Sequence, residues 1–197
     1  MSLAWGEIAK ICVAGAALGL SVGKIVVGRP HYLERLRPRL WLSVAKQMNV
    51  LDWLKLLLIA VAFAVGAVIT VGWVGYLVEG AGLPLYSPEE YIFARLERAS
   101  PIGMFVTINI LPIFEEWVFR GILLEEIGWR TRSRLLGILL SSIIFAAFHV
   151  SNPGTYPAAV IPLMVGGVLL GICYMLGGLA SAIVCHCVYN SLTFFGF

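Results

Sequence analysis

One long apolar run, residues 54–78, contains a single charged side chain, that of Lys55 near its start. A helix needs about 20 predominantly apolar residues to cross the hydrocarbon core of a bilayer, so this run predicts a membrane span. Composition agrees, because 60% of the 197 residues are hydrophobic, 13% are charged and the mean hydropathy is +0.92. A soluble domain normally carries about a quarter of charged residues. The composition therefore excludes a cytosolic enzyme, a disordered chain and a secreted disulfide-rich protein.

Four further apolar segments carry embedded polar residues and are also predicted to span the membrane: residues 101–128, 135–150, 158–176 and 178–195. A weaker candidate is residues 3–27, which Glu7, Lys10 and Lys24 interrupt. Because this segment lacks a clear small-residue cleavage site, a first membrane helix is favoured over a signal peptide. The predicted fold class is all-α, a polytopic bundle of about six transmembrane helices in a single integral membrane domain over residues 1–197.

Basic residues are concentrated in two connecting segments. Residues 29–55 carry six Lys or Arg and residues 129–134 carry three Arg, whereas residues 79–100 carry four Glu against two Arg. Since Lys and Arg accumulate on the cytoplasmic side, the first two segments are predicted to be cytoplasmic and the third external. Residues 88–99 are expected to form a short amphipathic helix, and residues 31–50 a basic, aromatic anchor at the membrane surface. Membrane lipid is thus an expected partner, and nucleic acid is not.

Small residues four apart predict close helix contacts within the bundle or between chains, which leaves a homo-oligomer open. They occur at Gly15, Gly19 and Gly23, and again at Gly167 and Gly171. The four cysteines lie in apolar stretches and are expected to be packed thiols: Cys12, Cys173, Cys185 and Cys187.

The segment 101–128 places Glu115, Glu116 and Arg120 near the middle of an apolar helix. A charged residue at the centre of a span costs about 3 kcal/mol, so these side chains are expected to face the interior of the bundle. Glu116 and Arg120, four apart, share a helix face and can neutralise one another. Glu115 is rotated about 100° from Glu116 and lacks a local partner. It is therefore the candidate base, because a carboxylate in a low-dielectric pocket binds a proton more tightly than in water. The alternative is a purely architectural ion pair.

The segment 135–150 contains His149, fifteen residues after Arg134, and Glu115 lies fifteen residues before Arg130. If residues 130–134 form the turn of a helical hairpin, both side chains rise about 22 Å from it and meet at one depth. The alternative for His149 is an interfacial group without a catalytic role.

The last segment places His186 and Asn190 on one helix face, four residues apart. They are candidates to hold a substrate carbonyl, and interhelical hydrogen bonding alone is the alternative. His186 follows Gly177 by nine residues, which places it about 13 Å from that turn and below the other two groups, unless the Gly177–Gly178 turn is recessed in the bundle.

This set of groups suits attack of an activated water on a carbonyl. Glu115, aided by His149, would take a proton from water, while His186 and Asn190 would donate hydrogen bonds to the developing oxyanion. The same residue types could also line a proton-coupled transporter, and a catalytically silent scaffold or immunity protein is a third class. No GxSxG, HExxH or Gly-rich phosphate loop occurs in the sequence.

Three motifs occur in order in the segment 101–195: Glu115-Glu116-x-x-x-Arg120, Phe145-x-x-x-His149 and His186-x-x-x-Asn190. They resemble the motifs of the CAAX prenyl protease and bacteriocin-processing family of intramembrane proteases, also called the Abi family. The resemblance implies an all-helical membrane endopeptidase in which Glu115 and His149 activate water and His186 and Asn190 stabilise the oxyanion.

The resemblance also bears on cofactor and substrate. Members have been called metalloproteases, and zinc bound by Glu115, His149 and His186 is the alternative to the favoured metal-free glutamate mechanism. The expected substrate is a membrane-associated peptide or protein. The chain is compact beside eukaryotic prenyl-processing members, so a prenylated tail is not assumed, and a prokaryotic plasma membrane is the expected location.

Overall fold

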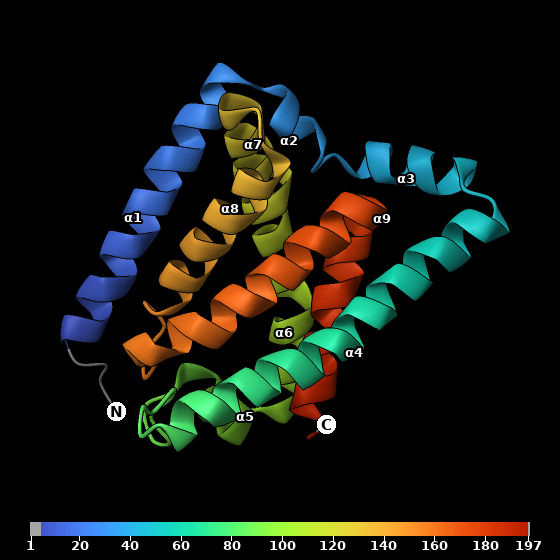
Figure 1. Cartoon of the computed structure of the whole chain (residues 1–197). Coiled ribbons are helices and arrows are strands. Elements are labelled where there is room, and N and C mark those ends of the chain that lie inside the picture. The colour runs from blue at the N-terminus through green and yellow to red at the C-terminus, as the bar shows by residue number, and fades with distance from the viewer. Residues whose placement is uncertain (1–4, 197) are drawn as a thin grey trace.

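The computed structural model describes residues 5–196, which are almost entirely helical (Figure 1). The elements are α1 (Trp5–Gly28), α2 (His31–Glu34), α3 (Pro38–Gln47), α4 (Val50–Gly80), α5 (Ile92–Ala99), α6 (Pro101–Glu116), η1 (Trp117–Leu124), α7 (Glu125–Thr131), α8 (Arg134–His149), η2 (Pro157–Ala159) and α9 (Val160–Phe194). In this part of the chain β-type pairing is limited to an isolated bridge between Tyr86 and Thr155. The predicted all-α fold class is confirmed.

Four helical stretches are long and apolar enough to cross a membrane: Trp5–Gly28, Val50–Gly80, Pro101–Thr131 and Pro157–Phe194. Helix α8 is apolar too but has only 16 residues. The fold is that of an integral membrane protein. The sequence predicted six spans, and two of these, 158–176 and 178–195, are the two halves of α9.

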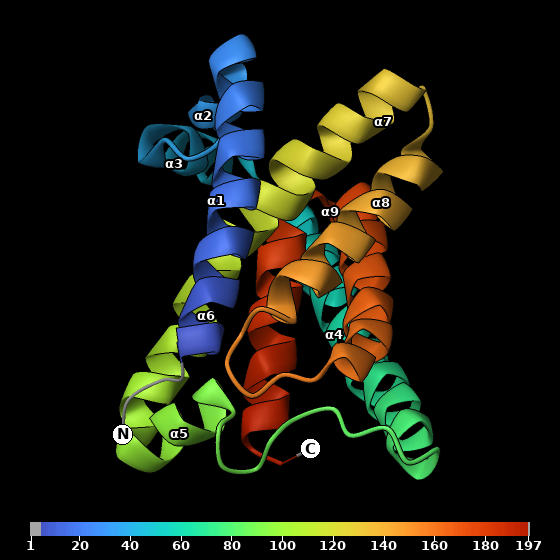
Figure 2. The same ribbon diagram turned by 90° about the vertical axis from the view of Figure 1, so that its left-hand side faces the viewer.

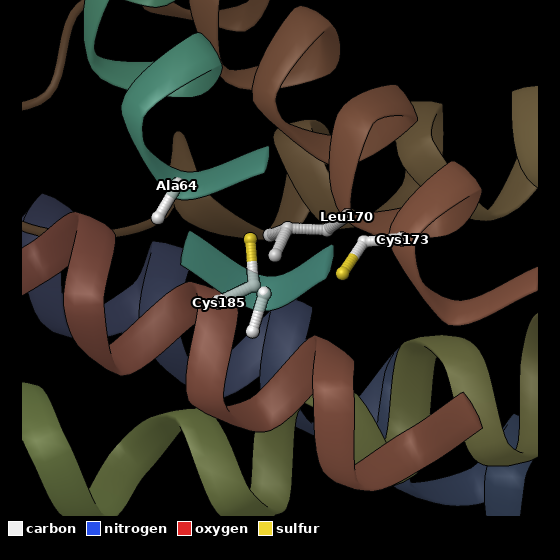
Figure 3. Close-up of a cluster of buried hydrophobic side chains, with 5 residues drawn as sticks. Ala64, Leu170, Cys173 and Cys185 are labelled. Carbon is white, nitrogen blue, oxygen red and sulfur yellow. The ribbon is translucent and has the colours of Figure 1, made fainter. Parts of the chain in front are cut away.

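Helix α9 is bent sharply at Gly178, whose φ of 75° and ψ of −173° are non-helical. A residue with a Cβ would be strained there, so the bend depends on glycine. The two halves diverge from the bend in Figure 1 and lie next to each other in the view of Figure 2, and Cys173 Sγ lies 3.6 Å from Ser181 Oγ across the bend. Together with α4 the halves enclose a buried core, most of which Figure 3 labels: Ala60, Ala64, Leu170, Cys173 and Cys185.

Helices α6, η1 and α7 form one continuous rod that carries the first motif. The rod begins at Ser100, whose hydroxyl accepts a hydrogen bond from the amide of Gly103 at 3.0 Å. It continues to Thr131, three residues beyond the predicted end. Its middle third, η1, is a π-helix rather than the α-helix that the sequence predicted, and Pro112 lies inside α6 just before it. Such wider turns are rare and recur at functional sites.

The two stripes of glycines four residues apart, one on α1 (Gly15, Gly19 and Gly23) and one on α9 (Gly167 and Gly171), differ in how closely they contact other helices. A Cβ on Gly167 would lie 2.9 Å from Ser142 Cβ, and one on Gly171 would lie 3.0 Å from Ile138, so this stripe lets α9 approach α8 closely. A Cβ on any of the three α1 glycines would meet nothing within 4 Å. The α1 stripe therefore makes no close contact with the other residues that the structure describes. Cys12, also on α1, is exposed, so its prediction as a packed thiol was wrong, whereas Cys173 and Cys185 are buried as expected.

The segment before α5 forms a loop instead of the first turn of the predicted 88–99 helix. The hydroxyl of Ser87 accepts from the amide of Glu90 at 3.2 Å, which closes a turn, and α5 begins only at Ile92. This loop pairs with the loop after α8, because Ser87 N donates to Gly154 O at 2.8 Å and Ile92 N to Pro153 O at 3.1 Å. The two loops and α5 lie at the end of the molecule opposite α2 and α3 (Figure 1).

At the α2 and α3 end of the molecule, Glu126 of α7 bonds to residues of both basic segments; it is 2% exposed. Its carboxylate accepts from Arg130 Nε at 2.7 Å and from Tyr32 Oη at 3.2 Å, and Arg29 Nε lies 3.3 Å away. The guanidinium of Arg29 also stacks 3.5 Å above the ring of Trp129. These contacts dock the segment that follows α1 onto the tip of α7.

Candidate active site

Three side chains from three helices converge at mid-depth of the bundle. Glu115 comes from α6, His149 from the last residue of α8 and His186 from the second half of α9. His149 Nε2 lies 3.8 Å from one carboxylate oxygen of Glu115, and His186 Nε2 lies 3.7 Å from the other. The hairpin geometry correctly predicted that Glu115 and His149 would meet. His186 reaches the same depth because the bend at Gly178 lies deeper in the molecule than the α7–α8 turn (Figures 1 and 2).

The hydrogen bonds of the two imidazoles fix which nitrogen faces Glu115. His149 Nδ1 lies 2.8 Å from the carbonyl oxygen of Phe145, and His186 Nδ1 lies 2.8 Å from Glu116 Oε1. Both partners are acceptors, so each Nδ1 carries the hydrogen. In a neutral ring the Nε2 lone pair then points toward Glu115. Two lone pairs and a carboxylate thus converge, an arrangement that calls for a donor such as water between them.

Glu116 and Arg120 lie behind His186 and are fully buried. Arg120 donates to Glu116 Oε1 at 2.8 Å, which confirms the predicted pair, and to the carbonyl oxygen of Gly167 at 2.9 Å. Glu116 Oε2 and Arg120 Nε have no hydrogen-bond partner among residues 5–196. Neither side chain lines the cavity described below. They therefore position His186 rather than contact a substrate.

Phe145, expected to be a core residue, is buried at the centre of this group. Its ring centroid lies 4.2 Å from that of His149 and 6.0 Å from that of His186. The guanidinium of Arg120 lies 4.6 Å from the same centroid. The ring thus packs near both imidazoles and the buried guanidinium.

Asn190 has a partner that the motif did not predict. Its side-chain amide donates to the carbonyl oxygen of Ile108 at 2.9 Å. In an α-helix that carbonyl would accept from the amide four residues later, but residue 112 is proline and has no N–H. Asn190 therefore supplies the hydrogen bond that Pro112 removes, and the second amide hydrogen of Asn190 is left for another acceptor.

A cavity of about 500 Å³ gives these groups access to the surface. Glu115, His149, His186 and Asn190 all line it. Its remaining walls come from α4, from the segment leading into α5, and from α5, α6 and α9. Its lining includes Glu97, an exposed residue of α5, and we call the end of the cavity at Glu97 its mouth.

Most of the wall was not predicted from the sequence; it includes Tyr86, Tyr91, Phe93, Glu97 and Tyr189. These residues have no motif spacing, and the amphipathic helix predicted over residues 88–99 was expected at the membrane surface rather than at a cavity.

A metal site was the alternative for Glu115, His149 and His186. Within residues 5–196 no three or more His, Cys, Asp or Glu side chains are arranged so that they could hold a metal ion. The donor types suit zinc, but their placement does not form a ready ligand set.

Comparison with known proteins gives one match, and it covers the motif-bearing part of the chain. Residues 97–192, from α5 into α9, match the family model of the type II CAAX prenyl endopeptidase Rce1-like proteins. This motif-bearing segment belongs to the CAAX prenyl protease family. No curated protein and no solved structure matches the chain. The matched segment contains all six polar motif residues, and the family is one of membrane endopeptidases, which agrees with the apolar helices.

Proposed function

We propose that this chain is an intramembrane endopeptidase that hydrolyses a peptide bond with a water activated by Glu115 and His149. The observation that carries the proposal is the carboxylate of Glu115 lying within 3.8 Å of two imidazole Nε2 atoms on the wall of one cavity. A base must lie within reach of the proton that it removes, directly or through one water, and this geometry meets the condition.

The reaction begins with a water that donates one hydrogen to Glu115 and the other to Nε2 of His149. Glu115 takes the first proton as the water oxygen bonds to the carbonyl carbon of the substrate, and the carbonyl electron pair moves onto its oxygen. Collapse of this tetrahedral species breaks the C–N bond, and Glu115 returns the proton to the leaving amine. The products are a carboxylic acid and an amine.

Two groups are placed to stabilise the oxyanion. The second amide hydrogen of Asn190 is free to donate to it. His186, which the carboxylate of Glu116 holds through Nδ1, is the second donor, from Nε2 of its protonated ring. Glu116 and Arg120 therefore act through His186.

The substrate enters, in this proposal, from the side of the membrane that faces α5. The cavity mouth is at that end, and the basic segments that favour the cytoplasm are at the other. The substrate is then a membrane-associated peptide or protein exposed on the external face of a prokaryotic plasma membrane, and a prenyl group is not required.

The test is cleavage of internally quenched peptides by purified protein in detergent. Glu115→Gln and His149→Ala should each abolish cleavage without unfolding the protein, and Glu89→Gln, which removes an exposed charge outside the cavity, should leave the rate unchanged. Full activity in either site variant contradicts the proposal. Solute uptake driven by a pH gradient in liposomes, without any peptide turnover, would instead indicate a transporter.

Metal dependence is tested on the same protein by elemental analysis and chelator treatment. The proposal expects cleavage to persist without stoichiometric zinc. One zinc per chain together with loss of cleavage on chelation would replace the side-chain mechanism with a metal-assisted one.

A further inference from the structure

The mouth of the cavity is built from aromatic side chains. Tyr86 and Tyr91 lie on the loop before α5, with ring centroids 4.4 Å apart, and Phe93 packs edge-on against Tyr91 at 5.6 Å. Tyr189 of α9 lines the same cavity. Burial raises the pKa of Tyr86 and Tyr91, so their phenols are uncharged at neutral pH. The faces of such rings carry negative electrostatic potential.

The charged side chains that line the cavity are both acidic. Glu97 lines the mouth and Glu115 the inner end, and within residues 5–196 no Lys or Arg lines the cavity. The neighbouring Arg98 is turned toward the loop, where its guanidinium donates to the carbonyl oxygens of Pro88 at 3.3 Å and Glu89 at 3.4 Å. In the part of the chain that the structure describes, Glu97 forms no salt bridge. Its carboxylate is therefore available to a ligand.

Helix α5 presents this acid together with its apolar residues. Phe93 and Glu97 are four residues apart and share one helix face with Ala94, and all three line the cavity. A carboxylate beside several aromatic faces is an arrangement that attracts cations, because the ring quadrupoles and the negative charge act in the same direction.

We propose that the mouth of the cavity is a subsite for a cationic side chain of the substrate, a Lys or Arg held by Glu97 and the aromatic rings of Phe93, Tyr91 and Tyr86. The inference rests on the proposed function, because it assigns the substrate class of the same cavity. It predicts substrates with a basic residue at a fixed distance from the cleaved bond.

The run of α6 along the cavity wall, from Met104 beside α5 to Glu115, sets the scale of that distance. Met104 lines the cavity on α6, which packs against α5, and Glu115 lies eleven residues further along α6. Eleven helical residues span about 16 Å. An extended peptide covers this in about five residues, at about 3.3 Å per residue. The basic residue should therefore lie about five residues from the scissile bond.

The test begins with a bond that wild-type protein cleaves in a neutral peptide mixture, located by mass spectrometry. Versions of that peptide carry Lys, Gln or Glu five residues before or after the bond. We expect the Lys version to have the highest kcat/KM, with the ratio of Lys to Glu falling about tenfold in Glu97→Gln. Glu89→Gln, an exposed acid of the same face, should not change the ratio. Equal rates for Lys and Glu peptides, or an unchanged ratio in Glu97→Gln, would overturn the proposal, as would a preference for an S-farnesyl cysteine at that position.

A binding measurement separates this proposal from the hydrolytic one. The Glu115→Gln protein is titrated in detergent with decapeptides of Ala, Leu and Ser that carry one central Lys, Gln or Glu. Tighter binding of the Lys peptide, lost when Glu97→Gln is added, supports the subsite even if no peptide is cleaved by wild-type protein. Equal affinity for all three peptides refutes the subsite whether or not cleavage occurs.

Discussion

Two buried glutamates lie ten residues apart on the same rod, and their surroundings differ. At Glu126 both carboxylate oxygens have donors, from Arg130 on one side and from Tyr32 and Arg29 on the other. At Glu116 one oxygen faces both Arg120 and His186, while the second has no partner among residues 5–196.

The surroundings beyond the glutamates differ too. Glu126 is not among the residues that line the cavity, whereas the partner of Glu116, His186, lines it and faces Glu115. A buried network in which every polar atom has a hydrogen-bond partner rigidifies a fold. Buried polar groups that lack a partner are more typical of functional sites. In the proposed mechanism Glu116 positions His186 for catalysis, whereas Glu126 stabilises the fold.

The largest expected effect is at His186, the only imidazole that contacts both Glu115 and Glu116. His186→Gln removes the oxyanion donor and the partner of a buried carboxylate, so kcat for peptide cleavage should fall about 10³-fold. His31→Gln, a change at an exposed histidine outside the cavity, should leave kcat unchanged. Cleavage at more than a tenth of the wild-type rate in folded His186→Gln would remove His186 from the mechanism.

Glu116→Gln should have the second-largest effect on kcat. An amide can present its N–H₂ to His186 Nδ1 and favour the wrong tautomer, so kcat should fall about 10²-fold. Because Glu116 does not line the cavity, KM should stay within about twofold, and Glu116→Asp should recover part of the rate. A change confined to KM would show that Glu116 acts on substrate binding instead.

Glu126→Gln should lower stability and leave kcat nearly unchanged, the opposite of Glu116→Gln. Loss of the charge that faces Arg29 and Arg130 should lower the free energy of unfolding in detergent by about 2 kcal/mol. The kcat of the folded fraction should stay within about twofold of wild type. A large fall in kcat at unchanged stability would contradict the architectural role.

The smallest expected effect on stability concerns Asn190 and Pro112. Asn190→Ala leaves the carbonyl of Ile108 without a donor and should destabilise the protein by about 1 kcal/mol. Pro112→Ala restores an N–H that can bond the same carbonyl, so Asn190→Ala should cost less in that background. A double-mutant cycle measures the coupling, and strict additivity of the two unfolding free energies would show that the two residues are independent.

Much of the fold could be predicted from the sequence because lipid imposes simple rules. Hydropathy located the apolar helices, and the rise per residue brought Glu115 and His149 to one depth. Spacing of four also predicted the Glu116–Arg120 pair, because such residues lie on one helix face.

The remainder depends on contacts between segments that are distant in the sequence. The depth of the bend at Gly178, which brings His186 to Glu115, is set by packing between the halves of α9 and α4. The bond from Asn190 to Ile108 needs a carbonyl freed by a proline on another helix. The cavity mouth consists of loop and α5 residues without motif spacing, so periodicity could not reveal it.

The most direct test of the hydrolytic site is a side-by-side measurement of Glu115→Gln and Glu126→Gln in one detergent. Initial rates of cleavage and free energies of unfolding are recorded for both variants and for wild type. Our account predicts that Glu115→Gln is stable and inactive, while Glu126→Gln is destabilised and active once folded. Comparable cleavage by folded Glu115→Gln and wild type would contradict it.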